Sequence, residues 1–406
     1  MKFIIDIEKY FHTDCLKRTY YSDGKKCKSL ENTTNGYSIL RYDKSLIDMK
    51  NYDNAKNIGN MRSVVVSKDG AVVCCSPSKS IQWDDFVANI EDYTPIVEEY
   101  VEGTMINMFW DAYTNSWECA TKNTIGCKSH YHHIDVDIYN QPKRDFLSMF
   151  YHAYYYNFLH FLHFDKTCCY SFVLQHPENR IVSRNVEPKL YLIACYKIVG
   201  TQLYYMDTDH IRSQVSAIIR DKGIKYNLRF PLKYEFTSVD DIRITYQSHP
   251  DYNVMGVVIK NPNTGQYSKI RNLTYMKIKD MVGNHTSLLY RYITLYKSGE
   301  LKIYLKYFPE HLFQFNKYFY LIKDFTSLLE MYFNRISAGG HFNNYFTRNK
   351  PHHVNMVYHL KNLGALYQGQ DRYLEASSIA HYVNDMSVNN LFYALKQFIR
   401  FSDDTL

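Results

Sequence analysis

The sequence lacks long apolar runs and blocks of like charge. No stretch approaches the ~20 consecutive apolar residues that a membrane-spanning helix needs, so no membrane partner is expected. Acidic side chains at Asp6 and Glu8 interrupt the start of the chain too early for a secretory signal peptide. Lys and Arg number 48 against 41 Asp and Glu, and no five basic residues follow one another. The net charge of +7 is therefore compatible with a polyanionic partner without requiring one.

Common catalytic signatures are also missing. The sequence has no Gly-x-Ser-x-Gly turn, no phosphate-binding P-loop and no Gly-x-Gly-x-x-Gly motif. Potential zinc ligands occur from Cys127 to His133 and at His352-His353, but no second pair has the spacing of a closed site. We therefore interpret both stretches as polar segments and expect no metal site.

Nine cysteines include the adjacent pairs Cys74-Cys75 and Cys168-Cys169. Neighbouring residues on a strand point to opposite faces, so these pairs indicate buried thiols rather than disulfides. The odd number of cysteines agrees with a reducing compartment. We expect a cytoplasmic location, which would be the host cytoplasm or the virion if the source is a virus.

Tyrosine is abundant, with 40 residues among 406. Together with frequent Asn, Lys and Ile and few Ala, this composition is most simply explained by an AT-rich genome. Tyrosine also stacks on bases, so a contribution to RNA binding is a secondary interpretation. The length is sufficient for two domains, each with its own core.

Strand patterns dominate the first part of the chain and helical patterns the last. Two hairpins are predicted, one around the turn Lys68-Asp69-Gly70 and one around residues 111–116. Further strands are predicted at 170–174, 190–198 and 256–259, and helical spacing at 144–164, 288–293, 301–307, 321–333 and 388–401. The fold class is therefore α+β. A mixed domain is expected over residues 1–283, of which 1–50 are hard to interpret, and an all-helical C-terminal domain over 284–406.

The octapeptide from Glu99 to Ile106 has the frame of a covalent nucleotidyltransferase site. Such enzymes attack ATP with a lysine amine in a Lys-x-Asp-Gly turn, because their intermediate is a lysyl phosphoramidate. In this chain the lysine position holds Tyr100, the acid is Glu102 and the turn glycine is Gly103. The nucleophile of this chemistry is therefore missing from its expected place.

Other segments agree with the same frame. They are Arg62-Ser63, Ser76 to Ile81, Thr121-Lys122-Asn123, Phe172 to Val182, Met255-Gly256-Val257-Val258 and Lys269-Ile270-Arg271. In this order they resemble the phage type-1 RNA ligases over roughly residues 55–400, most specifically at Pro177-Glu178-Asn179-Arg180-Ile181-Val182. The resemblance implies a nucleotidyltransferase domain of the ATP-grasp-like ligase kind, followed by the helical domain.

Against this family the chain is degenerate at three positions. Tyr100 replaces the nucleophilic lysine, and Val173 and Met255 replace carboxylates that the family uses near the ribose and the metal. Val and Met supply neither oxygen ligands for Mg²⁺ nor hydrogen-bond acceptors. The resemblance therefore implies a fold that has been kept and a reaction that has been lost, so no catalytic residue is expected.

The cations of the family's nucleotide site are mostly present. The resemblance implies nucleotide or phosphate contacts for Arg62, Lys79, Glu102, Gly103, Lys122, Lys269 and Arg271. Ordinary surface cations are an equally open interpretation. The sequence Lys56-Asn57-Ile58-Gly59 has a bare Lys-x-x-Gly spacing, but it precedes the Arg62 strand, whereas the family's nucleophile follows that strand.

The sequence thus predicts a catalytically inactive RNA-ligase-like protein, acting as a binding or structural component. The composition would suit a large DNA virus. The alternatives are an active ATP-dependent RNA ligase or nucleotidyltransferase with a non-standard nucleophile, and an RNA-binding protein. No cofactor is expected, unless the enzyme interpretation holds and ATP and Mg²⁺ are required. A protein assembly is slightly favoured as partner, and RNA remains open.

Overall fold

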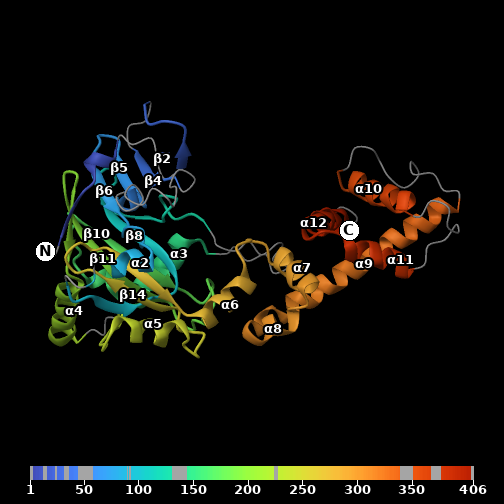
Figure 1. Cartoon of the computed structure of the whole chain (residues 1–406). Coiled ribbons are helices and arrows are strands. Elements are labelled where there is room, and N and C mark those ends of the chain that lie inside the picture. Colours follow the sequence, from blue (N-terminus) through green and yellow to red (C-terminus); the bar gives the residue numbers. More distant parts are fainter. Residues whose placement is uncertain are drawn as a thin grey trace. The chain divides into compact units, whose positions relative to one another are not determined.

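A computed structural model divides the chain into two compact units (Figure 1). The first comprises Met1–Tyr131 and Pro142–Lys279, and the second His132–Gln141 and Asp280–Leu406. The structure describes residues 3–11, 16–22, 25–31, 36–43, 58–88, 90, 93–129, 144–223, 227–338, 351–366 and 376–403. The division lies within helix α6 (Leu273–Val282), whereas the sequence places the boundary after residue 283.

A six-stranded antiparallel sheet forms the centre of the first unit. Its strands lie in the order β1 (Ile4–Asp6), β12 (Gln202–Met206), β11 (Lys189–Val199), β10 (Cys168–Gln175), β8 (Thr104–Asp111) and β9 (Ser116–Ala120). Strand β10 pairs with both β8 and β11, and its Val173 lies opposite Met105 and Tyr191. The strand that carries Val173 is therefore interior to the sheet.

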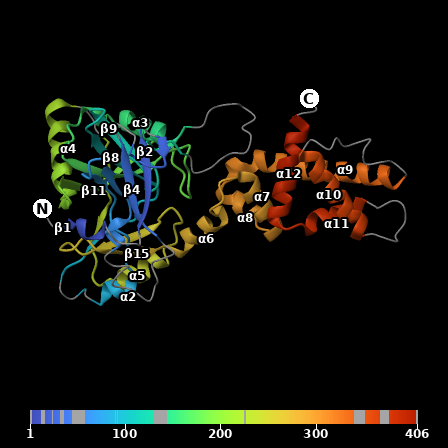
Figure 2. The same ribbon diagram turned by 90° about the horizontal axis from the view of Figure 1, so that it is seen from above.

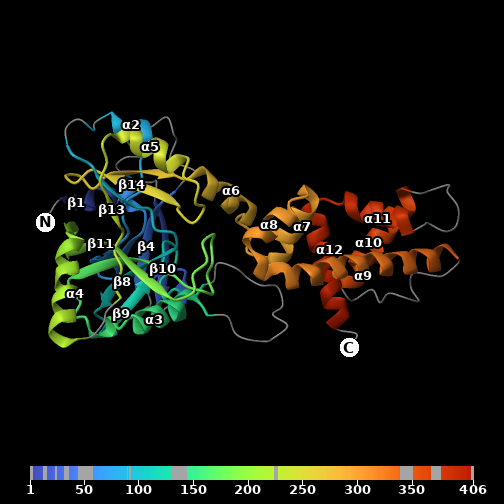
Figure 3. The same ribbon diagram turned by 90° about the horizontal axis from the view of Figure 1, so that it is seen from below.

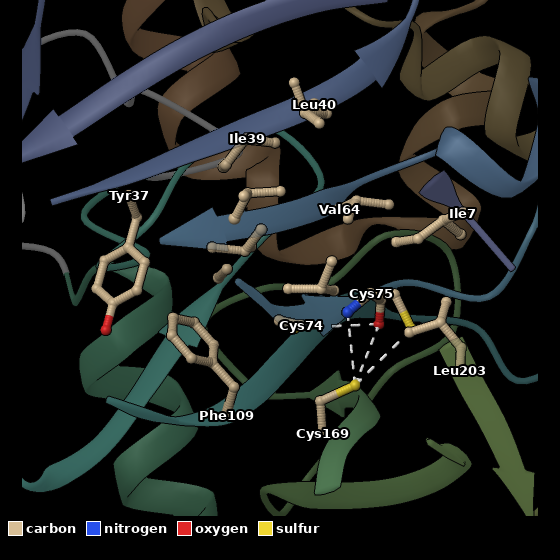
Figure 4. Close-up of a cluster of buried hydrophobic side chains, with 14 of the residues drawn as sticks. Ile7, Tyr37, Ile39, Leu40, Val64, Cys74, Cys75, Phe109, Cys169 and Leu203 are labelled. Carbon is tan, nitrogen blue, oxygen red and sulfur yellow. Dashed lines mark hydrogen bonds between the residues drawn. The ribbon is translucent and has the colours of Figure 1, made fainter. Parts of the chain in front are cut away.

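A five-stranded sheet packs on one face of this central sheet. Its strands lie in the order β3 (Lys25–Cys27), β2 (Leu16–Ser22), β4 (Tyr37–Tyr42), β5 (Val64–Ser67) and β6 (Val72–Cys75). Figure 4 shows the buried cluster between the sheets, in which Ile39 and Val64 face Phe109 and Leu203. The apolar strand β5 is buried at every residue, as expected for a strand inside a sandwich.

Two helices cover the other face of the central sheet. They are α3 (Phe146–Tyr156), which the short turn η4 (Leu159–Phe161) follows, and α4 (Thr208–Lys222). Phe150 of α3 and Val215 of α4 share one buried cluster with Phe172 of β10. Cys169 belongs to the cluster between the sheets and Cys168 to the cluster under the helices. Strand β10 is therefore buried on both faces.

A four-stranded sheet completes the first unit. Its order is β13 (Lys233–Tyr234), β7 (Ile96–Glu99), β14 (Gly256–Lys260) and β15 (Tyr267–Arg271). Helices α2 (Trp83–Val87) and α5 (Val239–Gln247) pack on it through Phe86 and Ile242 (Figures 2 and 3). Short turns η1 (Glu8–Tyr10) and η2 (Gly59–Met61) precede strands β2 and β5.

The second unit is helical in its described residues. Its elements are α7 (Leu288–Ser298), α8 (Leu301–Tyr307), η5 (Pro309–His311), α9 (Leu312–Ser337), α10 (Pro351–Leu366), α11 (Ala376–Asp385) and α12 (Val388–Asp403). Phe325 and Leu329 of the long α9 are buried, and α10, α11 and α12 all contact α9. Within the described residues, no helix combines the length and apolar character needed to cross a membrane.

The structure confirms both predicted hairpins, now β5–β6 and β8–β9. It also confirms the predicted α+β class, with sheets in the first unit and helices in the second. The cysteines in the described residues are free thiols, as predicted. Unlike Cys168 and Cys169, however, Cys74 and Cys75 both belong to the cluster between the sheets, beside a register shift in the β5–β6 pairing.

Candidate functional site

Tyr100 follows strand β7 and is held there by the neighbouring strand. Its backbone N–H donates to the carbonyl of Gly256 at 3.0 Å. Gly256 has a φ of +132°, and a Cβ at this position would lie 2.0 Å from the carbonyl oxygen of Ile270. Only glycine fits this close approach of β14 to β15. Gly256 therefore allows β14 to pack against β15 and accepts the hydrogen bond that holds the Tyr100 backbone.

Lys269 of β15 contacts the side chain of Tyr100. Its Nζ donates to the phenolic oxygen at 3.0 Å and lies 4.6 Å from the ring centre. Burial raises the pKa of Tyr100, but the charge and hydrogen bond of Lys269, with Arg271 and Lys279, outweigh burial and leave that pKa below its usual range. Burial, with Arg62 and Arg271, also lowers the pKa of Lys269, against the opposing effect of Tyr100.

A second group of cations surrounds Tyr42, the last residue of β4. The Nζ of Lys122 lies 5.1 Å from the centre of its ring, and that of Lys79 lies 5.9 Å away. Burial raises the pKa of Tyr42 and that of Tyr267, and the charge of Arg62 opposes the shift in both. The charge of Arg62 also lowers the pKa of Lys269, so Arg62 influences both the tyrosine–lysine pair and the cations around Tyr42.

We call Arg62, Lys79, Lys122 and Lys269 the cationic cluster. Its members come from the residue after η2, the segment after β6, the segment after β9 and strand β15. Arg271, on the same strand as Lys269, is exposed but close enough to influence both Tyr100 and Lys269. The structure thus brings the predicted cations together around three tyrosines, Tyr42, Tyr100 and Tyr267.

Glu102 and Gly103 have supporting positions. Sequence reasoning groups Glu102 with the nucleotide- and phosphate-binding residues, but its buried carboxylate accepts hydrogen bonds from the backbone N–H groups of Val182 (3.3 Å) and Ser183 (3.1 Å). Burial raises the pKa of Glu102, against these bonds and one from Tyr275. A Cβ on Gly103 would meet Leu174 O at 2.5 Å, so the turn must be glycine for β8 to approach β10.

The apolar residues Val173 and Met255 lie next to these glycines. Val173 is buried, and its Cγ1 is 2.6 Å from the position that a Cβ of Gly103 would take. Met255 precedes Gly256, and its carbonyl accepts from the N–H of Asn272 at 3.1 Å. Neither side chain offers an oxygen ligand. No cluster of three His, Cys, Asp or Glu suited to a metal occurs within the described part of the chain.

Three sequence candidates lie partly or wholly outside the described residues. Lys56 and Asn57 are outside them, while Gly59 accepts from the backbone N–H of Lys79 at 2.9 Å. Of the proposed zinc-ligand stretch, Cys127 is a buried thiol and residues 130–133 are outside. His352 and His353 lie in α10, and their side chains are not among those described.

Sequence reasoning missed a pair of histidines beside the turn after β10. Nδ1 of His176 accepts from the N–H of Glu178 at 3.1 Å, so its proton lies on Nε2, which donates to His152 Nδ1 at 2.9 Å. Arg144 donates to the same nitrogen of His152 at 2.6 Å. Burial, with the charges of His152 and Arg144, lowers the pKa of His176 to about 4. Lys279 was also missed, because a lone lysine on a helix has no signal in a single sequence.

Acid should destabilise the first unit through His176. Its pKa falls from 6.5 when unfolded to about 4 when folded, so the unfolded chain binds the proton more readily. The free energy of unfolding should therefore fall by at most about 3 kcal/mol as the pH is lowered from ~6.5 to ~4. The measurement is urea unfolding across this range followed by tryptophan fluorescence, since Trp83, Trp110 and Trp117 all lie in the first unit.

The variant His176→Asn keeps an acceptor for the Glu178 N–H but cannot titrate, so its stability should depend less on pH over this range. His249→Asn is the control, because His249 Nδ1 accepts from the Asp251 N–H at 3.2 Å in the same local geometry. An equally steep pH dependence in wild type and His176→Asn would contradict the assignment.

Comparison with known proteins gives limited matches. No protein-family model matches the sequence, and no curated protein matches it. Among solved structures, the chain is similar to RNA ligase from Naegleria gruberi. An apo lysine-to-alanine variant matches at 12% identity over 50% of this chain and 57% of that chain, with a TM-score of 0.36. A variant with ATP and Mn matches at 11% over 50% and 57%, with a TM-score of 0.37.

The same ligase with pyrophosphate matches at 13% identity over 50% of this chain and 57% of that chain, with a TM-score of 0.35. The chain thus spans little more than half of the ligase it matches. At these TM-scores the likeness establishes neither fold nor activity, so functional reasoning depends on the residues of this chain.

Proposed function

We propose that this chain is a catalytically inactive RNA-ligase-like protein that acts as a binding or structural component. The observation that carries the proposal is the Tyr100–Lys269 contact. The position that the resemblance assigns to the nucleophilic lysine holds a phenol, whose oxygen accepts a hydrogen bond from Lys269. A lysyl phosphoramidate cannot form at Tyr100. The apolar side chains of Val173 and Met255 remove the oxygen donors as well.

The second candidate is an active nucleotidyltransferase with a non-standard nucleophile. One observation favours it, because Lys269 is an amine next to Tyr100 and burial lowers its pKa. A lower pKa raises the fraction of neutral, nucleophilic amine. The absence of carboxylates at 173 and 255 weighs against this candidate, and a single mass measurement distinguishes the two.

The cationic cluster supports a more specific proposal, which is that the first unit binds an anionic group without a metal. Four cations near three tyrosine rings favour a phosphate-like ligand electrostatically. Glu102 lies on the same turn as Tyr100, but its carboxylate accepts hydrogen bonds from the backbone N–H groups of Val182 and Ser183. The cluster therefore has charge for the anion but lacks the oxygen ligands for Mg²⁺.

Inorganic pyrophosphate in the presence of EDTA is the probe for this proposal. We expect Lys122→Gln to weaken its binding about tenfold, as the loss of one charge-assisted contact predicts. Lys166→Gln is the matched control, because Lys166 also lies over an aromatic ring, 3.6 Å from the centre of Trp110, but outside the cluster. Calorimetric titration gives both affinities. Binding that appears only with Mg²⁺, or that both variants weaken equally, would contradict metal-free binding at the cluster.

We also propose that the helical unit carries part of the contact with a protein assembly. The outer face of α9 exposes Phe313 (60%), Phe319 (41%) and Tyr320 (61%), opposite its buried Phe325 and Leu329. Large exposed aromatic side chains are common in protein interfaces. The RNA alternative has support at the same face, since Lys317 and Lys323 lie 4.3 and 4.7 Å from the ring centres of Phe313 and Phe319.

A salt titration of RNA binding decides between these partners. If the partner is a protein, single-stranded RNA should bind only in the non-specific range at physiological salt. An affinity tighter than about micromolar, reduced by Phe313→Ala but not by Tyr393→Ala on α12, would favour RNA. Tyr393 is the control because it is equally exposed, at 63%.

A further inference from the structure

The helical unit contains a buried arginine with an empty hydrogen-bonding edge. Arg291 of α7 is only 5% exposed. Its Nη1 donates to the hydroxyl of Tyr304 on α8 at 3.3 Å. Its Nε and Nη2 are buried, and neither has a partner among the described residues. This arginine lies outside the cationic cluster and plays no part in the function proposed above.

The two unpaired nitrogens form one side of the guanidinium. On that side the Nε–H and Nη2–H bonds are parallel, and this fork matches the two oxygens of a carboxylate or phosphate. Arginine cannot lose its proton at accessible pH, so the buried group remains charged. A buried charge without a partner is strongly destabilising, whereas a bidentate anion supplies both the acceptors and the opposite charge.

The third nitrogen is held in place by an ordered group of rings. The Tyr304 hydroxyl that accepts from Nη1 lies 2.8 Å from Nδ1 of His311. The Tyr304 ring stacks on Phe308 and Phe315, with ring centres 4.6 and 5.5 Å apart. Tyr304 and Phe315 are buried. The guanidinium is therefore oriented by contacts on its Nη1 side, while its buried Nε and Nη2 have no hydrogen-bond partner among the described residues.

We propose that the Nε–Nη2 edge of Arg291 is a binding site for a carboxylate or a similar bidentate oxyanion. A neutral carbonyl would accept only part of the fork and would leave the charge uncompensated. The same chemistry has two sources, a free small anion and the side chain of Asp or Glu on a partner protein. Both would stabilise the helical unit by binding its folded form.

The test measures thermal unfolding of the full chain by far-ultraviolet circular dichroism, which the helical unit dominates. Sodium acetate and sodium phosphate are compared with sodium chloride at equal ionic strength. Blocked tripeptides Gly-Glu-Gly and Gly-Gln-Gly represent the side-chain source and its neutral control. We expect acetate, phosphate or the Glu peptide to raise the Tm by roughly 3 °C beyond chloride at about ten times its Kd.

Three variants assign the effect to Arg291. Arg291→Met should raise the Tm in chloride, because it removes an unpaired buried charge, and should abolish the anion-dependent rise. Arg291→Lys keeps the charge without the planar fork and should lose most of that rise, which tests the site even if the Met variant folds poorly. Arg335→Gln, at an exposed position near the end of α9, should retain it.

Shifts with acetate and phosphate support a free anion, and a shift with the Glu peptide alone supports a protein side chain. The proposal is overturned if no probe exceeds chloride, if the Gln peptide acts as well as the Glu peptide, or if Arg291→Lys keeps the full response.

Discussion

Incubation of the full chain with ATP and Mg²⁺ or Mn²⁺ should leave its intact mass unchanged. A covalent adenylate needs an amine at the nucleophile position, and Tyr100 has none. It also needs charge stabilisation at the reacting phosphate, to which the apolar Val173 and Met255 contribute nothing. Mass spectrometry of the intact protein is the measurement, because an attached AMP would be a discrete mass gain.

Restoring the amine alone should also fail. Tyr100→Lys replaces the phenol but leaves positions 173 and 255 without carboxylates, so the mass should again not change. Tyr100→Phe is the matched control, since it removes the hydroxyl that Lys269 contacts at 3.0 Å without adding an amine. An acid-labile, alkali-stable gain of one AMP on the wild-type chain would refute inactivity. If peptide mapping placed it on Lys269, the second candidate function would replace the first.

Gly256→Ala should destabilise the first unit by roughly 3–5 kcal/mol, a large part of the stability of an ordinary domain. Its φ of +132° is unfavourable for a side chain, and the new Cβ would lie 2.0 Å from the Ile270 carbonyl oxygen. That oxygen is backbone within the β14–β15 pairing, so it cannot move away without breaking the strand pair that holds Tyr100 and Lys269. Urea unfolding followed by tryptophan fluorescence measures the change.

Gly200→Ala separates the two causes of this effect. Gly200 also has a positive φ, +61°, but a Cβ there would meet no atom within 4 Å. We therefore expect a cost of only about 1–2 kcal/mol, from the backbone conformation alone. Equal costs for the two variants would mean that the close approach at Gly256 is not what requires glycine.

The strands that the sequence predicted are those with continuous apolar runs. Residues 64–66 and 72–75 are β-branched or otherwise apolar, and Asp69-Gly70 lies in the turn between them, so the local pattern was sufficient to predict this hairpin. Strand β2 was not predicted, because its sequence Leu16–Ser22 is mostly polar and has no apolar run, and its existence depends on pairing with β4. Pairing between distant strands is not visible in the local pattern of one sequence.

Part of the candidate site could likewise be predicted from the local sequence, and part of it could not. The position of Tyr100 could be found because the turn Tyr100-Val101-Glu102-Gly103 has a recognisable spacing between two strand patterns. The hydrogen bonds that the Glu102 carboxylate accepts could not be predicted, because the donors Val182 and Ser183 are about eighty positions further along the chain. The contact between His152 on α3 and His176 in the turn after β10 likewise joins two segments that meet only in the folded chain. Residue type identified the candidates, and only tertiary structure determined their contacts.

Strand β10 has both faces buried and both edges paired, and this limits the side chains that its positions can accept. A carboxylate at position 173 would now lie in a packed interior beside Gly103, where an unpaired charge is costly. An acidic residue at position 173 would therefore reduce stability, while position 100 would still hold a phenol and position 255 a thioether. If the chain is inactive as proposed, single substitutions would thus rarely turn it into a nucleotidyltransferase, and selection would act on what it binds.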